Sequence, residues 1–130
     1  MARTHHSIEL RRVYDPAAFA PHQGSRVLVD RLWPRGIRKE SLGSDLWLRD
    51  LGPSNELRHW FGHEPERWDE FHRRYREELR QEPQQRLLDQ LEGLAREGPL
   101  TLLYSARDEH HNQAVVVREV LEERLRHRER

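Results

Sequence analysis

Three short apolar runs along the chain have the pattern of buried β-strands. They lie at residues 8–14, 26–30 and 100–104. The second and third runs stop abruptly at charged residues, which is typical of a strand that leaves a sheet and enters a loop. We therefore predict three strands, of which the last two end at polar loops.

Five further segments carry apolar residues at helical spacing, and we predict helices there. Their ranges are about 44–51, 54–61, 65–79, 83–97 and 110–125. Ser44 and Ser54 are suitable N-caps, and Pro65 and Pro83 suit a first helical turn. The order of the elements predicts an α/β fold, with a small, mostly parallel sheet covered by helices in Rossmann-like layers. We expect one domain over residues 1–130, with flexible ends at about 1–6 and 126–130.

The composition narrows the possible functions of the chain. It is 35% hydrophobic and 35% charged, and its 23 basic and 23 acidic residues balance, so no global field favours nucleic acid or membrane. The absence of cysteine excludes disulfides, thiolate catalysis and cysteine zinc sites. The chain shows neither a membrane-length apolar run nor a signal peptide, and we expect a cytoplasmic protein.

The loop at residues 105–112 leads from the last predicted strand into the last predicted helix. Unpaired N–H groups at a helix start attract anions, so this loop is a candidate anion site. Ser105, Arg107 and Asn112 are candidates for ligand binding, and Asp108 and His111 are candidates for proton transfer. For Asp108 the more frequent role is that of a helix N-cap. The sequence contains no glycine-rich phosphate loop.

The loop after the second predicted strand begins at Asp30 and is rich in arginine. Asp30 is a candidate catalytic carboxylate, and Arg31, Trp33 and Arg35 are candidates for ligand binding. The alternative is structural: Trp33 fills the core, and Asp30 pairs with an arginine. Ligands in open α/β sheets lie beyond the carboxyl ends of the strands. The two loops share one cleft only if their strands are parallel neighbours.

A metal site is not expected. His59 and His63 are four residues apart, but Gly62 and Pro65 interrupt the helix that this spacing would need. No cofactor is implied by any motif.

Several long motifs resemble, in order, the YeaO-like branch of the domain of unknown function 488 family. They lie at residues 26–36, 47–54, 57–63, 68–75 and 102–112. The resemblance extends from about Ile8 to Leu125 and implies a small α/β protein of bacteria or archaea without an established activity. Larger members of the family place cysteines near the positions of Tyr104 and Asn112. This chain has none, so thiol chemistry does not carry over.

Three functions remain open at this point. The leading hypothesis is an anion-binding cleft for a phosphate-bearing small molecule or nucleotide, with hydrolysis or group transfer as the reaction class if the protein is an enzyme. The second is a nucleic-acid-binding module without catalysis, in which arginines follow the phosphates. The third is a structural or interaction protein that forms a homo-oligomer through the region of Trp47, Trp60 and Phe61.

Overall fold

The computed structural model describes residues 7–42, 44 and 46–128. Within these residues, four strands form one sheet in the order β1-β4-β2-β3, and every neighbouring pair is parallel. The strands are β1 (Ile8–Arg12), β2 (Ser25–Leu28), β3 (Leu46–Trp47) and β4 (Leu100–Tyr104). The predicted α/β class with a small parallel sheet is confirmed.

Four α-helices accompany the sheet in the described part of the chain. They are α1 (Asn55–Phe61), α2 (Trp68–Leu79), α3 (Glu82–Glu97) and α4 (Gln113–Arg128). Short 3-10 helices occur at η1 (Pro16–Phe19), η2 (Arg49–Leu51) and η3 (Pro65–Arg67). None of the described helices is both long enough and apolar enough to cross a membrane.

The predicted boundaries of α1 are confirmed by the structure. The Ser54 hydroxyl oxygen accepts a hydrogen bond from the Leu57 backbone N–H at 3.1 Å, which caps the helix start. Gly62 adopts the left-handed conformation, with φ of 52°, and ends the helix. The cap and the stop depend on residues within one turn, which is why the pattern alone located them.

The predicted helix at residues 44–51 is wrong. Leu46 and Trp47 form β3, which pairs with Val27 and Leu28 of β2, and only the 3-10 turn η2 follows. The Leu48 backbone N–H also donates to the Leu28 carbonyl at 3.0 Å. Pairing with the sheet satisfies the backbone of this segment and buries its apolar side chains, and this outweighs the local helical pattern.

Two predicted limits at the C-terminal side also change. The last helix begins at Gln113 and continues to Arg128, three residues beyond its predicted end at about Leu125. Of the flexible ends predicted at about 1–6 and 126–130, residues 1–6 and 129–130 lie outside the described residues.

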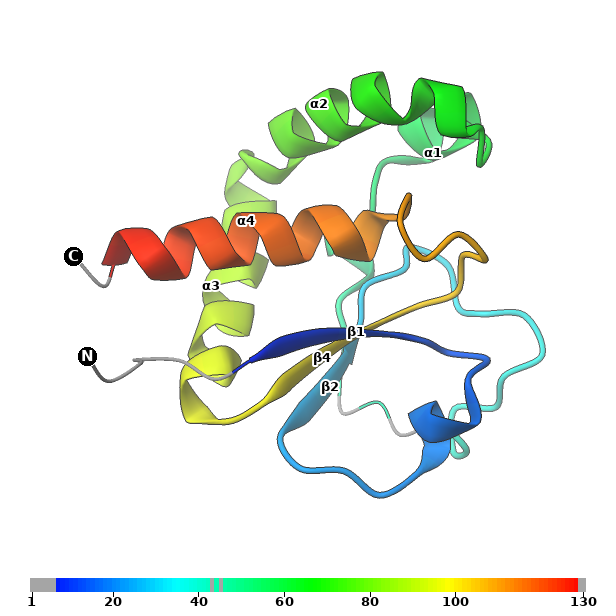
Figure 1. Ribbon diagram of the computed structural model, residues 1–130. Helices are drawn as coiled ribbons and strands as arrows, with labels where there is room; N and C mark the ends of the chain where they lie inside the picture. Colours follow the sequence, from blue (N-terminus) through cyan, green and yellow to red (C-terminus); the bar gives the residue numbers. More distant parts are fainter. Residues whose placement is uncertain (1–6, 43, 45, 129–130) are drawn as a thin grey trace.

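The two faces of the sheet pack against different layers. Val27, Leu102 and Tyr104 belong to the main core, which contains residues of all four helices. Leu28 and Leu103 point to the opposite face and pack in a second, smaller cluster that contains no residue of α1–α4. Figure 1 shows the helices gathered on one side of the sheet. Loops that follow β1 and β2 therefore cover the other face.

The parallel topology brings the two predicted loops together. β2 and β4 are direct neighbours, in a register that pairs Leu28 with Leu103. Their carboxyl ends point to the same edge of the sheet, on the right in Figure 1. The loops that begin at residues 29 and 105 therefore open at one place, as the shared-cleft hypothesis requires.

Candidate functional site

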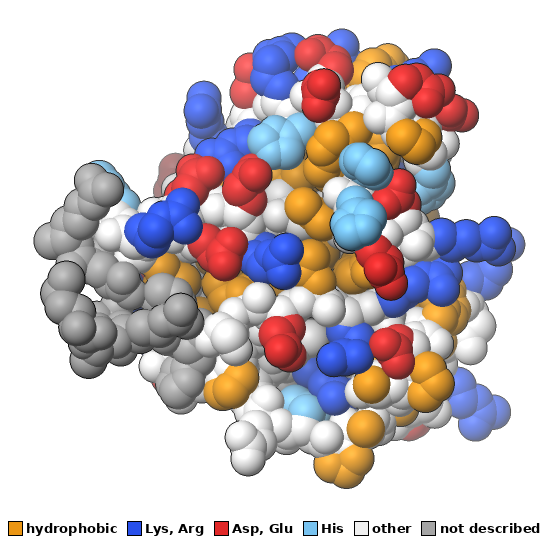
Figure 2. All heavy atoms as spheres, in the orientation of Figure 1, with side chains coloured by type: hydrophobic (Ala, Val, Ile, Leu, Met, Phe, Trp, Pro, Cys, Tyr) orange, Lys and Arg blue, Asp and Glu red, His pale blue; other side chains and the backbone are white. Residues whose placement is uncertain are grey.

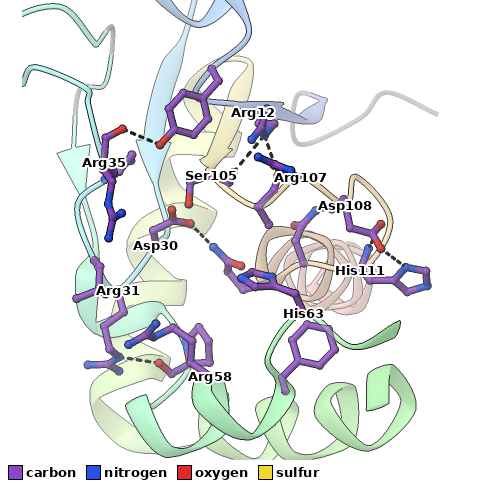
Figure 3. Close-up of a pocket in the computed structure, with 18 of the residues that line it drawn as sticks. Arg12, Asp30, Arg31, Arg35, Arg58, His63, Ser105, Arg107, Asp108 and His111 are labelled. Atoms are coloured by element: carbon purple, nitrogen blue, oxygen red, sulfur yellow. Dashed lines mark hydrogen bonds and ion pairs between the residues drawn. The ribbon is translucent and has the colours of Figure 1, made fainter. Parts of the chain in front are cut away.

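A cleft of about 970 Å³ lies at the carboxyl ends of β1, β2 and β4. It is lined by every site residue predicted from the sequence: Asp30, Arg31, Trp33, Arg35, Ser105, Arg107, Asp108, His111 and Asn112. Figure 3 shows labelled side chains of both loops around this one space. The fold brings these nine residues together around one cleft. The part that each of them plays in binding or catalysis remains a prediction.

The floor of the cleft is formed around Asp30, which is buried. Burial raises the pKa of its carboxyl group to about 6, against the opposing effect of hydrogen bonds from the Ser105 hydroxyl and backbone N–H and from Gln113. The side-chain amide of Gln113 donates directly to Oδ1 of Asp30. Trp47 donates its ring N–H to the Asp30 backbone carbonyl at 2.7 Å. Hydrogen bonds therefore hold both the side chain and the backbone carbonyl of Asp30 in place. The Asp30 carboxylate forms no ion pair within the described residues.

Asp108 and His111 form a pair at the rim. The His111 Nδ1 lies 2.8 Å from Oδ2 of Asp108, and the ring packs edge-on against Trp68 with centroids 5.1 Å apart. Hydrogen bonds from the backbone N–H of His110 and the His111 side chain lower the pKa of Asp108. In Figure 3 the His111 ring points away from Asp30. The predicted catalytic groups thus occupy two separate parts of the cleft.

The N-cap of α4 is Asn112, and not Asp108. The Asn112 side-chain oxygen accepts from the Val115 backbone N–H at 3.2 Å, and its amide nitrogen donates to the Asp108 carbonyl at 2.9 Å. Asp108 instead accepts from the backbone N–H groups of His110 and His111, inside the loop. Asn112 is buried, so both of its polar atoms serve the loop.

Two of the arginines that line the cleft hold the backbone. Arg31 donates to the carbonyls of Pro53 and Gly52 at 2.7 and 2.9 Å, which joins the β2 loop to the segment before α1. Arg12 donates through Nε to the carbonyls of Ser105 and Ala106 at 3.2 and 3.0 Å. Arg31 uses both Nε and Nη2 in these bonds, whereas the two bonds of Arg12 use Nε alone.

Arg35 and Arg107 differ from Arg31 and Arg12 in the contacts of their guanidinium groups. Both residues are exposed, and neither side chain forms a hydrogen bond or ion pair with any described residue. A third arginine, Arg58, has a buried Nε without a partner in the described part of the chain, and only a long 3.4 Å contact to Asn55. These three cations come from three different segments and surround the same cleft.

Aromatic side chains supply the apolar walls. Trp33 is half-buried, donates to the Ile37 carbonyl at 2.6 Å, and packs edge-on against Trp47. Trp33 thus packs against the smaller hydrophobic cluster, as its structural alternative predicted. Its ring also lines the cleft. Tyr14 stands at the mouth, with its hydroxyl donating to the Arg35 carbonyl at 2.8 Å.

Sequence reasoning missed several residues of the cleft. Arg12 is the last residue of β1, and Tyr14 follows two positions later. The rule that ligands lie beyond strand ends would have found both residues if the predicted strand had ended at Arg12 and not at Tyr14. Arg58, Phe61 and His63 come from the end of α1, and no local pattern places that helix over the sheet edge. Phe61 is buried, which corrects the expectation of an exposed aromatic surface there.

Trp60 also differs from the expectation of an exposed aromatic surface in this region. The guanidinium groups of Arg67 and Arg74 lie 5.3 and 4.5 Å from its ring centroid and cover it. Among the described residues, no three histidine or acidic side chains gather in a way that could hold a metal ion.

The sequence profile of a family described as "Inactive DUF488-N3 subclade" matches residues 7–130, and the chain belongs to this family. It is 45% identical over 113 residues to the uncharacterized protein YeaO of Escherichia coli K12, a match that covers 85% of this chain and 93% of the relative.

Mycobacterial relatives match a shorter segment of the chain. The uncharacterized proteins Mb3100c of Mycobacterium bovis and Rv3073c of Mycobacterium tuberculosis are each 51% identical over 72 residues. That segment covers 55% of this chain and 59% of each relative, so the match spans less than two thirds of their length. No solved structure shows a significant match.

Proposed function

We propose that this protein binds a phosphate-bearing small molecule or nucleotide in the cleft between the β2 and β4 loops, without catalysing a reaction on it. The observation that carries the proposal is a pair of guanidinium groups, those of Arg35 and Arg107, that have no partner among the described residues and lie on two loops facing one cleft. Arginine presents a planar fork of donors that matches phosphate oxygens, and the order of the parallel strands brings two such forks together.

The shape of the cleft supports a nucleotide within this class. Trp33 and Tyr14 offer aromatic surface near the free cations, and an aromatic face can stack on a nucleobase. The volume of about 970 Å³ lies at the upper end of the range for small-molecule sites. Phosphate recognition by arginine and base recognition by an aromatic ring can thus occur in the same cleft.

Binding without catalysis is favoured by how the candidate groups are arranged. Ser105 has its hydroxyl engaged with Asp30 on the floor, whereas His111 is held by Asp108 at the rim. Ser105 and His111 are thus each bonded to a different carboxylate and do not form a nucleophile–base pair with each other. Asp30, the carboxylate that accepts the Ser105 bond, is buried. The family description, which calls the subclade inactive, supports the same conclusion.

The test is a thermal-unfolding measurement with adenosine monophosphate, ribose 5-phosphate and pyrophosphate, each compared with adenosine. A ligand at 100 times its Kd adds about 2.7 kcal/mol to the free energy of unfolding, which raises the Tm by several degrees. Arg35→Ala and Arg107→Ala should each reduce the shift, and their combination should abolish it. The matched control is Arg86→Ala, which removes an exposed arginine on α3 that forms an ion pair with Glu82. If no phosphate compound raises the Tm of the wild type, the proposal is wrong.

A further inference from the structure

We propose that the cleft continues across Tyr14 into a second hollow and that the two together bind a short single-stranded oligonucleotide. This inference rests on the proposed function and names its ligand class. The second hollow has a volume of about 600 Å³ and lies beside β1 and the start of α4. Arg12 and Tyr14 line both hollows, so these two residues form the ridge between them.

The ridge presents an exposed aromatic ring in a fixed position. Tyr14 is 39% exposed and, with Phe19 and Leu32, is one of the large exposed apolar side chains of the described residues. Its ring is held by the hydroxyl bond to the Arg35 carbonyl and by the Arg12 guanidinium, which lies 4.7 Å from the ring centroid. Stacking on such a ring needs an unpaired base, because the bases of a duplex already stack on each other. This favours a single strand over a duplex.

Positive charge continues on both sides of the ridge. Seven arginines and four acidic residues line the two hollows, although the chain as a whole is neutral. In the second hollow, Asp15 is already paired with Arg11 at 3.2 Å, whereas Arg118 of α4 has no partner among the described residues. Figure 2 shows basic and acidic side chains interspersed over the visible face of the molecule. A strand that stacks a base on Tyr14 can therefore place phosphates near Arg107 on one side and Arg118 on the other.

Glu109 is the acidic residue that opposes this binding. It is exposed, it lines the second hollow, and it has no partner within the described residues. Its charge repels a phosphate placed beside Arg118. Removing that charge should therefore strengthen the binding of an oligonucleotide, an effect opposite in sign to the loss of an arginine.

The experiment compares thymidine monophosphate with a thymidine tetranucleotide by calorimetric titration of the full chain. We expect the tetranucleotide to bind at least tenfold more tightly, and to bind more tightly than a duplex of the same length. Arg118→Gln should reduce the ratio of the two affinities, and Glu109→Gln should increase it. Tyr14→Leu should weaken tetranucleotide binding by at least about fivefold, the lower limit for the loss of one base–aromatic stack. Tyr14→Phe, which keeps the ring, should bind nearly as the wild type does.

The outcomes separate the two proposals. If the monophosphate binds and the tetranucleotide binds no more tightly, the oligonucleotide inference is overturned and the proposed function stands. If neither binds, the oligonucleotide inference is overturned, and the thermal-unfolding test with adenosine monophosphate, ribose 5-phosphate and pyrophosphate decides the proposed function. If the tetranucleotide binds tightly but Arg118→Gln and Tyr14→Leu, shown by circular dichroism to be folded, leave its affinity unchanged, the second hollow is not the site. Arg86→Gln is the control for general loss of positive charge and should change neither affinity.

Discussion

The side-chain amide of Gln113 donates a hydrogen bond to the carboxylate of Asp30, although the two residues are 83 positions apart in the sequence. Gln113 is the first residue of α4, and Asp30 lies just after β2. The bond therefore connects the loop after β2 to the start of α4 across the floor of the cleft. It stabilises the ionised form of a carboxyl group whose pKa is raised to about 6 by burial.

Replacing Asp30 with asparagine should change how stability depends on pH. The folded protein holds the Asp30 proton more tightly than the unfolded chain, in which the pKa is about 3.9, so Asp30 makes folding less favourable as the pH rises through the interval between about 4 and 6. A pKa difference of about 2 corresponds to roughly 3 kcal/mol. Relative to wild type, the free energy of unfolding of Asp30→Asn should thus increase by about 2–3 kcal/mol between acid and neutral pH.

Urea unfolding at a series of pH values measures this difference. The control is Glu97→Gln, at the exposed end of α3, which should follow the wild-type pH dependence. Parallel curves for Asp30→Asn and the wild type would show that the pKa of Asp30 is not raised by folding.

Replacing Gln113 with alanine should raise the pKa of Asp30 further, because the amide bond favours the carboxylate. At pH 7.5, where the carboxylate form dominates, loss of this bond should cost about 1.5–3 kcal/mol of unfolding free energy, and less at acid pH. Titration of the Asp30 side-chain carbon by NMR gives the pKa directly. A pKa unchanged in the variant would mean that Gln113 does not bind the carboxylate in solution.

Replacing Gly52 with alanine should destabilise the protein. A methyl group at this position would lie 2.7 Å from the backbone nitrogen of Arg31, closer than packed atoms can approach. We expect a loss of about 1–3 kcal/mol in the free energy of unfolding, together with disruption of the Arg31 bonds to Gly52 and Pro53. Gly93 on α3 is the matched control, since nothing lies near its missing methyl group.

At Gly93 the same substitution should stabilise the helix by about 0.5–1 kcal/mol. Chemical denaturation of the Gly52→Ala and Gly93→Ala variants measures both changes in the free energy of unfolding. A Gly52→Ala variant as stable as the wild type would show that the close approach to Arg31 relaxes without cost.

Replacing Tyr75 with phenylalanine should also destabilise the fold. The Tyr75 hydroxyl is fully buried and donates to the Leu51 carbonyl at 2.6 Å, so the variant leaves a buried carbonyl without its partner. The expected cost is about 1–3 kcal/mol. Tyr14→Phe removes an exposed hydroxyl and should cost less than about 1 kcal/mol, because water replaces the lost donor at the Arg35 carbonyl. Chemical denaturation measures the free energy of unfolding of both variants. Equal losses in Tyr75→Phe and Tyr14→Phe would contradict the buried hydrogen bond assigned to Tyr75.

The arrangement of the cleft was predictable only in part. The charged ends of β2 and β4 identified nine residues that do line it, because a strand end marked by polar residues points to the edge of a parallel sheet. The sequence did not predict which of the arginines bind the backbone and which leave their guanidinium groups exposed to the cleft. Arg31 and Arg35 are four positions apart and look alike in the sequence, yet one binds two backbone carbonyls and the other has no partner among the described residues.

The sequence by itself determined the α/β class, the caps of α1 and the strands β2 and β4, because apolar periodicity and capping act within a few residues. Only the tertiary structure decided that residues 46–47 pair with β2 as a strand, and that Asp30 meets Gln113. Both depend on backbone pairing and burial between segments far apart along the chain, where the interaction partner, and not the local pattern, sets the lowest free energy.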